Sequence, residues 1–192
     1  LRDSGVAELL PTVDAAVFDE AHQLVEAGVQ FLGTTLATGA ALDLARDLLA
    51  LGLQHARGLE PWADLQAALE RATRELRLAA AGPLREVRGT LKLRWEERDE
   101  ALAAPLQGLA DAARDAAEAA ARVAEAAPDF PRLEQRARNL ALLAARFVLD
   151  AAADQVRWID LTPQQARLVE SPLDIREMLT EQRRASPKAW VF

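Results

Sequence analysis

Between residues 25 and 153, apolar residues recur at the three- and four-residue spacing that is typical of amphipathic helices. This spacing predicts four helices, which cover 33–53, a segment that begins at Pro61 and ends near Gly82, 94–127 and 129–149. The third is rich in alanine, and small side chains allow neighbouring helices to approach closely. The pattern therefore predicts a bundle of about four helices.

Both ends of the chain instead show the short apolar or alternating runs of β-strands. The predicted strands are Asp14–Phe18, 155–161, 166–170 and Lys188–Phe192, with a hairpin turn at Thr162-Pro163.

Ser171-Pro172-Leu173-Asp174 has the residues of a helix start, because serine can cap, proline suits the first turn and aspartate favours the positive helix end. We expect this helix to end near Arg184. The fold class is therefore mainly α with a small α/β part. Three regions are expected: 1–24, the helical insertion 25–153, and a return segment 154–192.

The first predicted strand leads directly into the acidic tetrapeptide Asp19-Glu20-Ala21-His22. In open α/β sheets, ligands bind at the carboxyl ends of the strands. Mg²⁺ takes one or two protein carboxylates and keeps substrate phosphates and waters as its other ligands. Asp19 is thus the candidate metal ligand, directly or through water. Glu20 is the candidate group that orients or deprotonates an attacking water, and His22 would sense the nucleotide.

The order of elements resembles the DinG/YoaA branch of the XPD-like, superfamily 2 DEAH DNA helicases. The resemblance is carried by Asp19–His22 as motif II, the helical insertion, the Arg157-Trp158 hairpin and the Ser171–Asp174 segment. It implies an incomplete RecA-like domain that is interrupted by an arch-like helical bundle and runs to just before motif III. It also implies an ATP-dependent 5′-to-3′ DNA helicase of repair or replication, in which motif II serves Mg-ATP hydrolysis and the arch guides single-stranded DNA.

Some features of that family fall outside this sequence. A phosphate loop does not occur, since the glycine-rich stretch Gly33–Gly39 lacks the lysine and the spacing. The family's 4Fe-4S cluster would precede motif II. The chain begins at Leu1, and its one methionine is Met178, so we interpret it as a piece of a longer enzyme. By itself it is expected to bind no cofactor and to be inactive, whereas the intact enzyme would use ATP and Mg²⁺.

Composition narrows the possible partners. The chain holds 23 basic and 30 acidic residues, so a nucleic-acid contact requires a local patch rather than the overall charge. Cysteine is absent, which excludes disulfides and thiolate metal sites within these residues. No apolar run approaches the roughly 20 residues of a bilayer span, so no membrane partner is expected, and a cytoplasmic location is compatible with the sequence.

The best candidate for a DNA-contacting patch lies where basic residues cluster, between residues 71 and 94. Seven cations occur there against Glu75 and Glu86, whereas the following stretch to residue 129 is acidic. Phosphates attract clustered cations and bases stack on aromatic rings, so the preferred contacts form a set near a predicted bundle tip. They are Arg85, Arg88, Lys92, Arg94 and Trp95.

Simpler interpretations compete with this one. Two helices of opposite charge could pair within the bundle, with Trp62 and Trp95 in the core. Trp158 is expected in the core rather than as a stacking surface, and His55 at an exposed helix end. The acids at 96–100 are expected to be solvated rather than to bind a metal.

Two alternative functions remain open. The bundle could be a protein–protein interaction module that docks a repair or replication partner. Alternatively, Asp19–His22 could occur by chance in a helical protein, which predicts that Asp19 lies within a helix.

Overall fold

The computed structural model describes residues 15–17, 33–84, 87–174 and 189–191. The chain divides into two compact units, of which one comprises Thr35–Ala151 and Arg157–Val169 and the other the remaining residues. The larger unit holds the helices and most of a four-stranded sheet, and the smaller unit holds two short strands.

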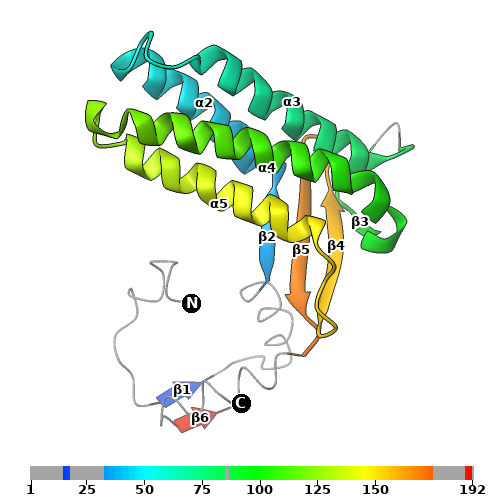
Figure 1. The fold of residues 1–192 in the computed structure, drawn as a ribbon. Coiled ribbons are helices and arrows are strands. Elements are labelled where there is room, and N and C mark those ends of the chain that lie inside the picture. The colour runs from blue at the N-terminus through cyan, green and yellow to red at the C-terminus, as the bar shows by residue number, and fades with distance from the viewer. Residues whose placement is uncertain (1–14, 18–32, 85–86, 175–188, 192) are drawn as a thin grey trace. The chain divides into compact units, whose positions relative to one another are not determined.

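Four helices form the bundle of the larger unit, and they lie side by side in Figure 1. They are α2 (Thr38–His55), α3 (Trp62–Ala81), α4 (Asp99–Arg122) and α5 (Phe130–Val148). The predicted bundle and the predicted class, mainly helical with a small sheet part, are both confirmed.

Alanine and leucine side chains fill the centre of the bundle. On α4, the predicted apolar face is fully buried, and its members are Leu102, Leu106, Leu109, Ala113, Ala116 and Ala120. Because alanine extends only one carbon from the backbone, this face lets the neighbouring helices approach closely. The helix continues through Pro105, which lies in its second turn.

A close contact between Gly52 and Trp62 joins α2 to α3. Trp62 is 2% exposed, its Nε1 donates to the carbonyl of Ala56 at 2.8 Å, and its ring stacks on Phe130 at 5.7 Å between centroids. A Cβ built on Gly52 would lie 2.7 Å from Cε2 of this ring and closer still to Cγ and Cδ2. The glycine is needed here because the indole occupies the space of a side chain.

We expect Gly52→Ala to destabilise the chain by about 1–3 kcal/mol in urea unfolding, because the buried and hydrogen-bonded ring cannot move aside. Gly108→Ala is the matched control, since Gly108 is an exposed helical glycine and a Cβ added to it would meet nothing within 4 Å. That control should be stabilised by up to about 1 kcal/mol. If Gly52→Ala and Gly108→Ala stabilised the chain equally, the contact between Gly52 and Trp62 would not be tight.

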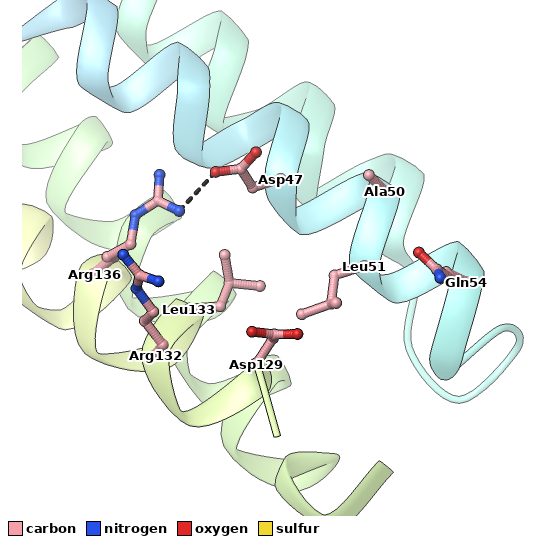
Figure 2. Close-up of a pocket in the computed structure, with 8 residues that line it drawn as sticks. All are labelled: Asp47, Ala50, Leu51, Gln54, Asp129, Arg132, Leu133 and Arg136. Carbon is pink, nitrogen blue, oxygen red and sulfur yellow. Dashed lines mark hydrogen bonds and ion pairs between the residues drawn. The ribbon is translucent and has the colours of Figure 1, made fainter. Parts of the chain in front are cut away.

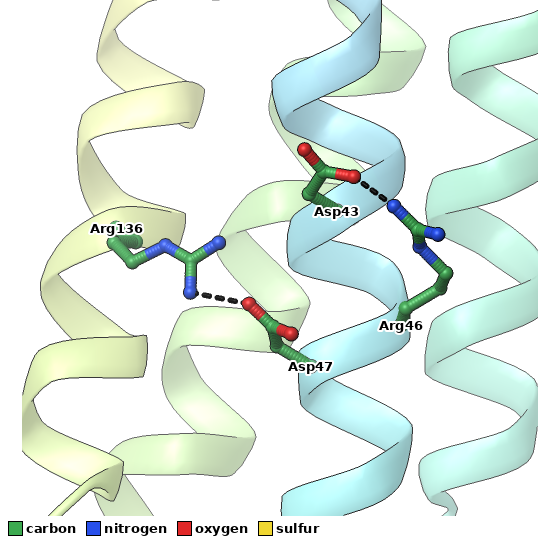
Figure 3. A network of polar contacts seen from close by, with 4 residues as sticks. All are labelled: Asp43, Arg46, Asp47 and Arg136. Carbon is green, nitrogen blue, oxygen red and sulfur yellow. Dashed lines mark hydrogen bonds and ion pairs between the residues drawn. The ribbon is translucent and has the colours of Figure 1, made fainter.

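Ion pairs link segments at the surface of the bundle. Arg122 at the end of α4 makes two hydrogen bonds to the Glu60 carboxylate, at 2.6 and 2.8 Å, and these lower the pKa of Glu60 from its ordinary value. Asp47 on α2 and Arg136 on α5 pair at 2.6 Å, beside the pair of Asp43 with Arg46 within α2 (Figure 3).

The sheet has the strand order β2-β5-β4-β3. Its strands are β2 (Thr34–Ala37), β3 (Leu91–Arg94), β4 (Gln155–Leu161) and β5 (Ala166–Pro172). The predicted hairpin is confirmed as β4 and β5, joined at Thr162, whose N–H donates to the Gln165 carbonyl at 2.9 Å. β3 runs antiparallel to β4 at the edge of the sheet.

Alternation along the strands gives the sheet two different faces. The inner face joins the core of the bundle, and its buried residues include Ile159, Leu161, Ala166 and Leu168. The outer face carries residues of opposite parity, which include Lys92 and Arg94 on β3 and Trp158 on β4.

One arginine, Arg157, anchors the hairpin to the end of α5. It is 6% exposed, and its guanidinium donates to the carbonyls of Leu149, Arg146 and Phe147 at 2.6, 3.1 and 3.3 Å. The last carbonyls of a helix lack partners within the helix and carry partial negative charge. Arg157 therefore caps α5 from a neighbouring strand.

Three predicted boundaries are wrong. Residues 34–37 form strand β2 rather than the first turn of a helix, and Thr38 Oγ1 ties the start of α2 to β5 by accepting from the Ala166 N–H at 3.0 Å. The helix predicted from residue 94 begins at Asp99, after β3 and a 3₁₀ turn. Ser171 and Pro172 belong to β5 rather than to a helix start, and the rest of the helix predicted to Arg184 lies outside the described residues from position 175 on. In each case, sheet pairing overrides the local preference.

The smaller unit contains β1 (Ala15–Val17) and β6 (Ala189–Val191), which pair in parallel with Ala15 opposite Ala189 and Val17 opposite Val191. The strands predicted at both ends of the chain are thus confirmed. Parallel neighbours require a crossover connection, and here residues 18–188 provide it. The helical bundle is therefore an insertion between two adjacent strands.

Candidate nucleic-acid interface

The proposed catalytic residues Asp19, Glu20 and His22 lie outside the described residues, as does Arg85. Strand β1 ends at Val17, two positions before Asp19. The acidic tetrapeptide thus follows the carboxyl end of a parallel strand. In open α/β sheets, ligands bind at that end of the strands.

The outer face of the larger sheet brings a basic set together. Register pairs Arg94 with Trp158 and Lys92 with Asp160, and residues that pair across antiparallel strands share a face. Arg167 is exposed between the buried Ala166 and Leu168, so its alternation puts it on the outer face as well. Lys92, Arg94 and Arg167 are exposed there.

A half-buried indole supports this basic set. The Lys92 Nζ lies 4.8 Å from the ring centroid of Trp158, a distance at which an ammonium is attracted to an aromatic face. Among the charged residues that these strands carry on the outer face, Asp160 is the acidic one. The outer face can thus attract phosphate groups while the indole holds one cation in place.

Trp95 belongs to a different environment from the cations that precede it. Its ring packs against the core, 5.7 Å from Phe147 between centroids and 5.1 Å from the Arg157 guanidinium carbon. The predicted set is therefore divided, with Lys92 and Arg94 on an edge strand rather than in a loop or at a bundle tip. Arg88 is exposed in the segment before that strand.

Two residues of this face lie outside the patch predicted from the sequence. Trp158 is half-buried on the outer face rather than in the core, and Arg167 joins the face from β5. The alternation of residues in β4 and at the start of β5 indicates this placement. It puts Trp158 on the opposite face from Arg157 and Ile159, and Arg167 on the opposite face from its two apolar neighbours.

Helices α3 and α4 pack against each other, as the simpler interpretation expected, although no ion pair among the described residues joins their side chains. Arg74 pairs with Glu70 on its own helix, and Arg77 bonds to the carbonyls of Thr162 and Pro163. As that interpretation also expected, Trp62 is buried. His55 is exposed in the last turn of α2, as predicted.

The acids at 96–100 are exposed, and within the described ranges no three residues of metal-ligating type are grouped to hold an ion. In the same part of the chain, no helix has the length and apolar character needed to cross a membrane.

A groove of about 440 Å³ lies between α2 and α5 (Figure 2). Its lining mixes Leu51 and Leu133 with charges of both signs, including Asp129 and the Asp47–Arg136 pair. Because these charges oppose one another, the groove favours neither an anion nor a cation.

Comparison with known proteins finds sequence similarity over a short stretch. The ATP-dependent DNA helicase YoaA of Escherichia coli strain K12 is 44% identical over 48 residues, which are 25% of this chain. The ATP-dependent DNA helicase YoaA of Haemophilus influenzae is 38% identical over a stretch of the same length. The matched stretch is 8% of either relative. No protein-family model matches the chain. A quarter of the chain is thus similar to part of a DNA helicase.

Proposed function

We propose that the chain is part of an ATP-dependent 5′-to-3′ DNA helicase of the DinG/YoaA type that acts in DNA repair or replication. The observation that carries this proposal is the parallel pairing of β1 with β6 across the helical insertion, with the acidic tetrapeptide following β1. The similarity to YoaA gives independent support.

In this proposal, the smaller unit contributes the nucleotide chemistry of the intact enzyme. Asp19 would hold Mg²⁺, directly or through water, and Glu20 would orient or deprotonate the water that attacks the γ-phosphate. His22 would couple the nucleotide state to domain movement. The phosphate loop and the 4Fe-4S cluster would come from parts of the enzyme before residue 1.

The outer face is the proposed contact for single-stranded DNA. Three exposed cations, Lys92, Arg94 and Arg167, lie on strands of one sheet, so they could bind successive phosphates of one DNA strand. This contact keeps Lys92 and Arg94 of the set predicted from the sequence and adds Arg167, while Trp95 packs against the core. Arg85 and Arg88 precede β3 and stay candidates by their position in the sequence.

The contact is tested by measuring single-stranded DNA affinity against salt concentration for the full-length protein. If Lys92 and Arg94 each neutralise one phosphate, Lys92→Gln/Arg94→Gln should reduce the slope of log K against log salt by about 1.4. At low salt, affinity should fall by about tenfold.

The matched control is Arg46→Gln/Arg114→Gln, which removes two exposed arginines that pair with acids on their own helices. It should leave the slope unchanged. If both double variants weaken binding equally, the effect is one of net charge and the outer face is not a specific contact.

A further inference from the structure

A pocket of about 440 Å³ opens where the start of α4 meets the end of α5, on a part of the larger unit that the proposed function does not use. We refer to it as the acidic pocket. Its lining includes Trp95, Asp99, Glu100, Phe147, Leu149 and Asp150. Trp95 is half-buried and Phe147 is 2% exposed behind it, with ring centroids 5.7 Å apart, whereas Val148 and Leu149 are 37% and 68% exposed at the rim.

The rim of this pocket carries net negative charge. Glu96, Glu97 and Arg98 line an adjoining hollow that shares Asp99 and Glu100 with the pocket, so acids outnumber cations there. Within the described part of the chain, none of these four acids, nor Asp150, forms an ion pair. The guanidinium of Arg157 reaches the pocket, but it bonds to the carbonyls at the end of α5.

This combination identifies the chemistry of a ligand. Like charges repel one another across the rim, so a cationic partner would be attracted, whereas nucleic acid would be repelled. The exposed side chains of Val148 and Leu149 are removed from water only when an apolar group covers them. A partner that satisfies both has an apolar side chain flanked by lysine or arginine.

We propose that the acidic pocket docks a basic, apolar-anchored peptide segment of another protein. The anchor would pack on Val148 and Leu149, beside the half-buried Trp95, and the flanking cations would pair with the rim carboxylates. This interaction uses none of the residues assigned to the ATP site or the outer face, so it can fail or hold independently of the helicase proposal.

The test uses three fluorescein-labelled nine-residue peptides, in which lysine alternates with leucine, lysine with serine, or glutamate with leucine. Their binding to the 192-residue chain is followed by fluorescence anisotropy. We expect the lysine–leucine peptide to bind at least about tenfold more tightly than either of the others, because it alone supplies both charge and apolar surface.

Variants locate the binding. Glu97→Gln/Glu100→Gln should weaken lysine–leucine binding by about tenfold, whereas Asp115→Asn/Glu118→Gln, which removes two exposed acids further along α4, should change it less than about twofold. If Glu97→Gln/Glu100→Gln perturbs the start of α4, the double variant Glu96→Gln/Asp150→Asn repeats the test with two other acids of the rim. Circular dichroism verifies that each variant is folded.

Three results would overturn the proposal: equal binding of the lysine–serine peptide, an equal loss in the Glu97/Glu100 and Asp115/Glu118 double variants, or no binding of the lysine–leucine peptide. It would also fail if sedimentation showed self-association that Glu97→Gln/Glu100→Gln abolishes, because the occupant would then be a second copy of this chain.

Discussion

Replacing Glu20 by glutamine in the full-length protein should reduce the rate of ATP hydrolysis by at least about 10²-fold, the usual contribution of a positioned general base. Glutamine has nearly the size of glutamate but cannot accept a proton from water. ATP binding should persist, because Asp19 is the proposed metal ligand. Steady-state phosphate release and equilibrium binding of labelled ATP measure the two quantities separately.

Glu75→Gln is the control for this substitution, since Glu75 is an exposed glutamate on α3, and it should hydrolyse ATP at the parent rate. Normal hydrolysis by Glu20→Gln would remove the role assigned to Glu20. Loss of both binding and hydrolysis would indicate a structural role for Glu20 instead.

Replacing Arg157 by methionine should destabilise the 192-residue chain by about 2–4 kcal/mol, because one buried and two partly buried carbonyls at the end of α5 lose their hydrogen-bond donor. Methionine can fill much of the space between Trp95 and Phe147, so the loss would come from hydrogen bonding rather than from a cavity. Urea unfolding followed by circular dichroism gives the free energy of unfolding.

Arg167→Met is the matched control, on the same hairpin but exposed on the outer face, and it should change stability by less than about 0.5 kcal/mol. The stability of Arg157→Lys should lie between those of the two methionine variants. The lysine ammonium lacks the planar fork of donors with which the guanidinium reaches several carbonyls. If Arg157→Met were as stable as Arg167→Met, the arginine would not be an important cap of α5.

The helices were predictable because the apolar residues that they bury recur every three or four positions along the sequence. The buried face of α4, from Leu102 to Ala120, follows directly from apolar spacing. The hairpin of β4 and β5 was predictable for a similar reason, since less exposed and more exposed positions alternate along β4 and over residues 166–168 at the start of β5.

The short strands β2 and β3 were not predictable, because four residues give too little periodicity and their pairing partners lie far along the chain. Lys92 and Arg94 are the clearest example. Only the register with Trp158 and Asp160 shows that these cations share a face and that Trp95 does not. For the acidic tetrapeptide, the strand before it is confirmed, while the roles of Asp19, Glu20 and His22 stay predictions.

Strand separation by the full-length protein tests the helicase proposal most directly. Duplexes with a 5′ or a 3′ single-stranded tail would be incubated with ATP and Mg²⁺, and release of the labelled strand would be followed over time. The proposal predicts release from the 5′-tailed duplex, which stops when ATP is omitted and is absent for the 3′-tailed duplex. No ATP-dependent release from either duplex would contradict it.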